Sequence, residues 1–114
     1  MKKGIYFINE KLTAGDYEPE SIHEIQKKAA QDYMKINRIS SVRLNPWQLN
    51  DHYENLHALY YDLKEGKMML DCLVCFNEQS ASDFAAAYPA RWLLLKSFFH
   101  EICFSEEKAL PAAE

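Results

Sequence analysis

Short continuous apolar runs alternate along this chain with longer stretches in which apolar residues recur at helical spacing. The clearest run, Cys-Leu-Val-Cys-Phe at residues 72–76, lies between polar segments. A run of this length is typical of a strand that is buried on both faces of a parallel sheet. Comparable runs predict strands at residues 4–9, 39–44 and 101–104. The run at 39–44 is less apolar, which favours a position near the edge of the sheet.

The stretch after the first strand predicts a loop at residues 11–20 and then a helix that begins near Ser21. Ser21 and Glu24 have the spacing of a capping box, in which two side chains satisfy backbone amides at a helix start. We expect this helix to end at Asn37. Its predicted apolar face consists of Ile22, Ile25, Ala29, Tyr33 and Ile36.

A second helix is expected after a loop at residues 45–50. Asn50 or Asp51 is expected to cap its start. Gly66 is expected at its end, where glycine readily adopts a left-handed conformation. Its predicted apolar face consists of Tyr53, Leu56, Leu59, Tyr60 and Leu63.

A third helix is expected after the buried strand, with Ser80 or Ser82 as its N-cap. Pro89 has no backbone N–H, so we expect the helix to kink or restart there. The apolar positions of this segment are Phe84, Tyr88, Trp92, Leu95, Phe98 and Phe99.

The alternation of strands and helices predicts an α/β fold in one domain. Parallel strands with right-handed crossovers would give a three-layer sandwich around a mainly parallel, four-stranded sheet of flavodoxin-like type. We assign residues 1–104 to this domain and expect residues 105–114 to form a frayed tail.

Composition and charge argue against binding of nucleic acid by this chain on its own. The chain has 114 residues, of which 48% are hydrophobic and 26% charged, and its net charge is −4. Arg38, Arg43 and Arg91 are the only arginines. Proteins that hold a phosphate backbone usually carry a basic stripe. None is visible, so we do not expect the chain to bind DNA on its own.

The cysteines indicate a reducing, cytoplasmic location. Cys72, Cys75 and Cys103 form an odd set inside apolar runs, which is typical of buried, reduced thiols. Residues three apart on a strand point to opposite faces, so Cys72 and Cys75 are not expected to chelate one ion. No signal peptide or membrane-spanning run is visible. We expect no metal and no cofactor.

Six segments, in order along the chain, carry a resemblance to one protein family. They are Gly4-Ile5-Tyr6-Phe7, Ser21-Ile22-His23-Glu24-Ile25-Gln26-Lys27-Lys28-Ala29, Asp51-His52-Tyr53-Glu54-Asn55-Leu56, Glu65-Gly66-Lys67, Glu78-Gln79-Ser80-Ala81-Ser82-Asp83 and His100-Glu101-Ile102-Cys103-Phe104. This ordered set resembles the catalytic domain of the serine recombinases, the resolvases and invertases. The corresponding family motifs are I-Y-x-R-V-S, S-I-x-x-Q-x-x-x-L, D-R-x-x-L, E-G-x, D-R-L-x-R-D and H-G-V-x-F. The resemblance implies a resolvase-like topology over nearly the whole chain.

The family's chemistry does not carry over to these residues. A serine recombinase attacks a DNA phosphodiester with a serine oxygen that is surrounded by arginines. Here Glu10 stands at the place of the serine, and Ile8 and His52 stand at the places of two arginines. Glu78, Gln79 and Ser82 replace an aspartate and two further arginines. We likewise expect no counterpart of the family's dimerisation helix and DNA-binding domain. The resemblance therefore implies a shortened relative with the fold kept and the catalytic residues lost.

A strand-end pocket is nevertheless a candidate site, because ligands bind at the carboxyl edge of open α/β sheets. Its candidate residues are Asn9, Glu10, His52, Asn77, Glu78, Gln79 and Ser82. Glu10 and Glu78 could form a carboxylate pair for acid–base work or for a divalent metal. We favour the alternative, two solvated loop carboxylates. His52 could face the same pocket or be an exposed histidine at a helix start.

Aromatic residues suggest a protein interface. Tyr60 and Tyr61 are adjacent on a predicted helix, so both cannot face one core, and an outward aromatic would suit a partner. The segment at residues 92–99 is apolar nearly all round, so it is either sandwiched in the fold or buried against a second copy. The interface candidates are Trp47, Tyr60, Tyr61, Trp92, Phe98 and Phe99.

Three functional hypotheses follow. The leading one is a non-catalytic interaction or regulatory module that binds a protein partner or forms a homodimer. The second is a small-ligand-binding protein or an enzyme that reuses the strand-end pocket. The third is a remnant of a recombinase from a mobile element.

Overall fold

The computed structural model describes residues 1–12, 18 and 21–106. Its elements are β1 (Lys2–Phe7), α1 (Ile22–Ile36), β2 (Ile39–Ser41), β3 (His52–Tyr53), α2 (Leu56–Gly66), β4 (Leu70–Cys75), the short 3₁₀ helix η2 (Glu78–Ala81), α3 (Ser82–Ala87), α4 (Pro89–Lys96) and β5 (Phe99–Phe104). Most of the loop expected at residues 11–20 lies outside the described residues.

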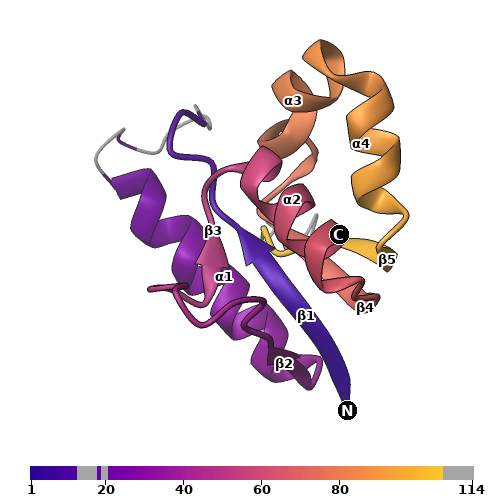
Figure 1. The fold of residues 1–114 in the computed structure, drawn as a ribbon. Coiled ribbons are helices and arrows are strands. Elements are labelled where there is room, and N and C mark those ends of the chain that lie inside the picture. Colours follow the sequence, from indigo (N-terminus) through magenta and orange to yellow (C-terminus); the bar gives the residue numbers. More distant parts are fainter. Residues whose placement is uncertain (13–17, 19–20, 107–114) are drawn as a thin grey trace.

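The sheet is parallel throughout its described pairs, with strand order β2-β1-β4-β5 (Figure 1). The predicted α/β class and the edge position of β2 are confirmed. The prediction of four strands misses β3, a fifth strand that pairs with β1 through Tyr6↔His52 and Phe7↔Tyr53. Two residues are too short to show an alternating pattern, so the sequence suggested a helix start there instead.

Helices cover both faces of the sheet (Figure 1). On one face, Tyr6 of β1 and Val74 of β4 pack with Ala30 and Met34 of α1. On the other face, alternate residues of the same strands pack with α2 and α4. The strand residues are Ile5, Phe7, Leu73 and Cys75, and the helix residues include Leu59, Leu63 and Leu95. Both central strands are therefore buried on two sides, as the apolar run at residues 72–76 predicts.

The face of α1 that is buried in the structure is rotated about the helix axis relative to the predicted apolar face. The buried residues are Ile22, Gln26, Ala30 and Met34, and Ile36 is 78% exposed. The difference arises at Gln26, a polar residue that an apolar pattern passes over. Its amide donates to Asn9 O at 2.9 Å and accepts from Asn9 N at 3.0 Å. These two bonds allow a buried glutamine at the centre of the helix face.

Helix ends also differ from the predicted ones. Ser21 makes no side-chain capping bond, although α1 does end at Asn37 as expected. Asn55, not Asn50 or Asp51, caps α2 by accepting from two backbone amides. The left-handed residue after α2 is Lys67, with φ 51°, while Gly66 remains the last helical residue. Several residues near each end suit these roles chemically, so the chain path decides among them.

The third predicted helix is divided into three parts. Asn77 caps η2 in a reciprocal pair with Ser80. The helix then restarts at Pro89, as predicted, between α3 and α4. After β5, the backbone amides of Ser105 and Glu106 donate to carbonyls of residues 75 and 76, so the expected tail begins as a continuation of the ladder. Residues 107–114 lie outside the described residues.

The close approach of β2 and β4 to β1 depends on Gly4. A Cβ atom at this position would lie 2.7 Å from Ile39 Cγ2 and 2.9 Å from the backbone oxygen of Cys72. We expect Gly4→Ala to reduce the free energy of unfolding by roughly 1–3 kcal/mol, the usual range for overpacking. Urea unfolding followed by circular dichroism measures this loss.

Gly66→Ala is the matched control. The nearest atom to its added Cβ would be Met68 Cγ at 3.5 Å, an ordinary contact. Alanine is also favoured over glycine in a helix by roughly 0.5–1 kcal/mol, so this variant should be unchanged or more stable. Equal losses in the two variants would contradict the steric explanation for Gly4.

Candidate functional site

Two of the candidate pocket residues, Asn9 and Asn77, make bonds that join the carboxyl ends of β1, β4 and β5. Asn9 Nδ2 donates to Ser80 O at 2.9 Å, and both backbone groups of Asn9 bond with Gln26. Asn77 Oδ1 accepts from Ser80 N at 3.2 Å, and Asn77 Nδ2 donates to Glu106 at 3.4 Å. These amides are thus occupied by bonds that shape the sheet edge.

The other strand-end candidates point to solvent. Glu10, Glu78, Gln79 and Ser82 are exposed, and Ser82 Oγ donates to Gln79 O at 3.0 Å. Within the described ranges, no hydrogen bond or ion pair joins Glu10 or Glu78 to His52. The structure therefore gives no support to a shared carboxylate site at this edge.

His52 lies elsewhere, on the α1 side of the sheet. It is 7% exposed, and its ring stacks on Tyr6 with centroids 5.2 Å apart. His52 Nε2 lies 3.0 Å from Glu54 Oε2, and His23 Nε2 approaches the same oxygen at 3.0 Å. We call His23, His52 and Glu54 the histidine cluster. The sequence interpretation missed His23 and Glu54, although His52 and Glu54, two apart on an extended segment, could have been expected on one face.

A second carboxylate lies behind the cluster. Asp51 Oδ1 accepts from Tyr6 OH at 2.8 Å and lies 3.8 Å from His52 Nδ1. Burial, together with the bond to Asp51, raises the pKa of the Tyr6 phenol well above its usual range. The phenol therefore remains a proton donor, and it fixes the orientation of Asp51.

Electrostatics within the cluster favour the charged forms of His23 and Glu54. The hydrogen bond to Glu54 raises the pKa of His23 above its ordinary value of 6.5. Hydrogen bonds from His52 and His23 lower the pKa of Glu54 below its ordinary value. The two histidines thus share one carboxylate oxygen, an arrangement that depends on which ring nitrogens carry protons.

A second group of possible metal ligands lies across β4 and β5. The donor atoms of Cys72, Glu101 and Cys103 lie within 4.8 Å of one another, and Cys103 Sγ donates to Glu101 at 3.1 Å. Cys75 packs on the opposite face, in agreement with the predicted separation of Cys72 and Cys75. All three cysteines are free and buried, as expected. Burial raises the pKa of Cys72, and raises that of Cys103 to about 12.

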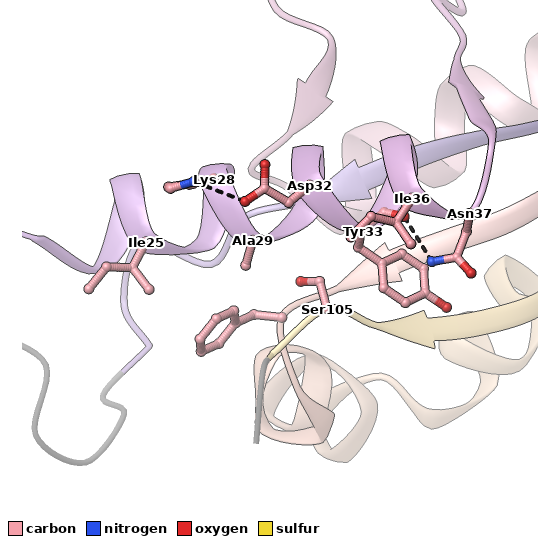
Figure 2. A pocket seen from close by; sticks show the side chains of 9 residues that line it. Ile25, Lys28, Ala29, Asp32, Tyr33, Ile36, Asn37 and Ser105 are labelled. Atoms are coloured by element: carbon pink, nitrogen blue, oxygen red, sulfur yellow. Dashed lines mark hydrogen bonds and ion pairs between the residues drawn. The ribbon is translucent and has the colours of Figure 1, made fainter. Parts of the chain in front are cut away.

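A groove of about 560 Å³ runs between α1 and the residues that follow β4 and β5 (Figure 2). It is lined by Ile25, Lys28, Ala29, Asp32, Tyr33, Ile36, Asn37, Phe76 and Ser105. Lys28 pairs with Asp32 at 2.9 Å along its rim. The volume lies within the range of small-molecule sites. The sequence did not indicate this groove, because the half-buried residues of α1 were expected to lie in the core.

The aromatic candidates separate into inner and outer residues. Tyr60 packs against the core beside Phe98, with ring centroids 6.2 Å apart, while Tyr61 is 62% exposed. Trp92 and Phe98 are half-buried and Phe99 is buried. The apolar segment at residues 92–99 packs on the core through one face only, since Leu93 and Leu94 are 64% and 52% exposed, so it is not sandwiched within the fold, and burial against a second copy stays a prediction. Trp47 is 85% exposed, so Trp47 and Tyr61 are the candidates that reach the surface most fully.

Hydrogen bonds hold the loop that carries Trp47, which we call the Trp47 loop (residues 43–50). Arg43 donates to Gln48 O at 2.6 Å, and the Gln48 side chain accepts from Leu44 N at 3.0 Å. Asn45 Oδ1 accepts from Trp47 N, while Asn45 Nδ2 donates to Asp62 of α2. The loop is therefore hydrogen-bonded to α2 at Asp62, the residue that follows Tyr61.

Comparisons with known proteins found no match: no family model, no curated protein and no solved structure aligned with this chain. Within the described ranges, no helix has the length and apolar character that crossing a bilayer requires.

The histidine cluster predicts a pH-dependent stability in the presence of a chelator. The pKa of His23 is raised in the folded protein, so protonated His23 stabilises the fold. This contribution to the free energy of unfolding is complete below pH 6.5, the ordinary pKa of histidine, and is lost as pH rises through the folded pKa. We expect the urea midpoint of the protein to fall over that interval, and Glu54→Gln to flatten the fall. Glu65→Gln, an exposed change on α2, is the control and should leave the profile unchanged. A wild-type slope that persists in Glu54→Gln would contradict this assignment.

Proposed function

We propose that this protein is a non-catalytic module with a resolvase-like α/β fold that acts by binding another protein. The strand order β2-β1-β4-β5 supports the fold part of the proposal. If the two-residue β3 is set aside, this order equals 2-1-3-4, the beginning of the flavodoxin-like order. The helices on both faces are compatible with the same architecture.

The positions of the arginines support a non-catalytic role. Arg38 lies in the turn between α1 and β2 with φ 56°, and Arg43 donates to carbonyls of the Trp47 loop. Arg91 contacts His57 and lies over the ring of Tyr60. Stabilising a phosphoryl transition state requires cations aimed at the reacting phosphate. Arg43 and Arg91 are engaged in these contacts, and Arg38 precedes β2 at the amino end of the strands, whereas Glu10 follows the carboxyl end of β1.

The observation that carries the binding proposal is the Trp47 loop. Trp47 and Leu49 are 85% and 91% exposed, yet the backbone that bears them is held by side-chain bonds at several points. A large apolar side chain on an ordered loop loses little conformational entropy when it is covered. Tryptophan and tyrosine are the residues most enriched at binding hot spots. Tyr61, which is 62% exposed, lies on α2, the helix to which Asn45 of the loop is bonded through Asp62.

The chemistry of this surface indicates the kind of partner. Residues 44–49 contain no charged side chain, and the Arg43 guanidinium is turned to backbone carbonyls. An uncharged, protruding indole is complementary to an apolar pocket on a folded protein. We therefore expect a protein partner that takes Trp47 into such a pocket.

Photo-crosslinking in the source cells tests this proposal. For this experiment, photoreactive benzoylphenylalanine replaces the exposed Asn50 in the full chain, and mass spectrometry identifies the protein in the adduct. Calorimetry with the purified partner then compares the wild type with a Trp47→Ser, Leu49→Ser double variant. We expect at least tenfold weaker binding, since loss of a hot-spot residue costs about 2 kcal/mol or more.

Leu93→Ser with Leu94→Ser is the matched control, because these leucines of α4 are also exposed, at 64% and 52%. The control should bind within about twofold of the wild type. The proposal is wrong if the Trp47 double variant binds as tightly as the wild type, or if crosslinking gives no protein adduct. If the adduct contains a second copy of the chain, the partner is this protein itself and the complex is a homodimer.

The groove beside α1 favours a second candidate function, the binding of a small ligand. Its walls combine apolar residues with Tyr33, Asn37 and the Lys28–Asp32 pair. We expect a matching phosphate, nucleotide or small carboxylic acid to raise the melting temperature of the wild type, and Ala29→Phe to abolish the rise by filling the groove. Ala58→Phe, on the exposed side of α2, is the control. No stabilisation by any of these compounds would count against this function.

A further inference from the structure

The histidine cluster has the composition and geometry of a metal site. We propose that His23, His52 and Glu54 bind one zinc ion where the first turn of α1 meets β3. This site goes beyond the proposed protein-binding function and does not depend on it. His23 belongs to α1, His52 to β3 and Glu54 to the segment that follows β3. The ion would link the start of α1 to β3 and thus to the sheet. Figure 1 labels both elements.

The donor atoms converge on one point. His23 Nε2 and His52 Nε2 each lie 3.0 Å from Glu54 Oε2, and all three donor atoms lie within 4.8 Å of one another. Around a tetrahedral zinc ion with bonds of about 2.0–2.1 Å, neighbouring donors are about 3.3 Å apart. Both nitrogen–oxygen distances are within a few tenths of an ångström of this value, and the two nitrogens, which lie within 4.8 Å of each other, reach a coordination shell by a rotation of the half-buried His23 ring.

The surroundings of the buried His52 ring are compatible with a metal ion at Nε2. Its side chain is 4% exposed, and its Nδ1 atom has no hydrogen-bond partner. If Nε2 donates to Glu54, a neutral ring presents the Nδ1 lone pair toward the Asp51 carboxylate, which is unfavourable. When Nε2 instead binds a cation, the ring carries its proton on Nδ1. That N–H then faces Asp51 Oδ1, now 3.8 Å away.

Both histidines have a carboxylate behind the ring. Glu24 Oε2 lies 3.3 Å from His23 Nδ1, and Asp51 Oδ1 lies behind His52 and is held by Tyr6 OH. Metal-binding histidines usually donate their second ring N–H to a carboxylate, which orients the ring and increases its basicity. The cluster supplies such a partner twice. Glu24, Asp51 and Glu54 also give the site the negative charge that a divalent cation needs.

The donor set selects the class of ion. Two imidazoles and one carboxylate suit zinc and related transition metals, whereas magnesium and calcium prefer oxygen donors. Three protein ligands leave one tetrahedral position for water. His52 is buried, but His23 is half-buried and Glu54 is exposed, so the ion can enter from the Glu54 side.

The cysteine group on β4 and β5 is the weaker metal candidate. Zinc binds the thiolate form, and burial disfavours thiolates at both Cys72 and Cys103. Cys103 also already donates its thiol hydrogen to Glu101. The two candidate sites differ in donor chemistry, which makes them distinguishable by experiment.

Zinc titration of the chelator-treated full chain tests the site. In competition with a chromophoric chelator, we expect one zinc ion per chain with a dissociation constant below about 1 µM. Cobalt substitution should give weak visible bands of nitrogen and oxygen ligands, without the intense near-ultraviolet band of thiolate coordination. His23→Ala and Glu54→Gln should each weaken binding at least about 100-fold, above the range seen when an outer partner is lost. His23 is half-buried and Glu54 exposed, so both variants are expected to fold.

His100→Ala is the matched control, since this exposed histidine lies on β5, and it should leave zinc affinity unchanged. The proposal is overturned if no zinc binds below about 100 µM, if His23→Ala binds as tightly as the wild type, or if cobalt shows the thiolate band. The Trp47→Ser, Leu49→Ser variant should bind zinc normally. Failure of the zinc site and failure of the protein-binding surface are therefore separate results.

Discussion

Burial of β1 and β4 on both faces is the constraint on which the rest of this structure depends. Ile5, Tyr6, Leu73 and Val74 are all completely buried. Because successive residues of a strand point to opposite faces, these two strands supply apolar surface to both helical layers at once. Each fully buried side chain of this size contributes about 1.5–3 kcal/mol. A shift of one residue in register would exchange the two faces, so the pairing is strongly specified.

The polar groups of the proposed zinc site are positioned from this buried frame. Tyr6 is a core residue of β1, yet its hydroxyl reaches Asp51 and its ring stacks on His52. Gln26 fixes the turn after β1 to α1 through both backbone groups of Asn9. A buried polar side chain is tolerated where its bonds are satisfied, and Tyr6 contacts the histidine cluster directly through its ring and through Asp51.

The shortest strand connects the two proposed sites. In β3, His52 turns to the α1 side and joins the histidine cluster, while the next residue, Tyr53, turns to the α2 side. Tyr53 OH donates to Asp62, which also accepts from Asn45 of the Trp47 loop. Neighbouring residues on one strand thus serve surfaces on opposite sides of the sheet.

The sequence by itself determined the α/β class, the doubly buried strand at residues 72–76, the restart at Pro89 and the buried state of the cysteines. These features follow from local apolar patterns and from the covalent chemistry of single residues. The tertiary structure alone decided the two-residue β3, the choice of Gln26 for the inner face of α1, and the choice of Asn55 and Lys67 at the ends of α2. It also brought His23 to Glu54, which are separated by most of α1, β2 and β3. The pairing of β3, the burial of Gln26 and the meeting of His23 with Glu54 each depend on a partner distant in the chain, which leaves no periodic signal in the segment that meets it. The ends of α2 are local, but neighbouring residues compete for each terminal position, and the path of the chain decides among them.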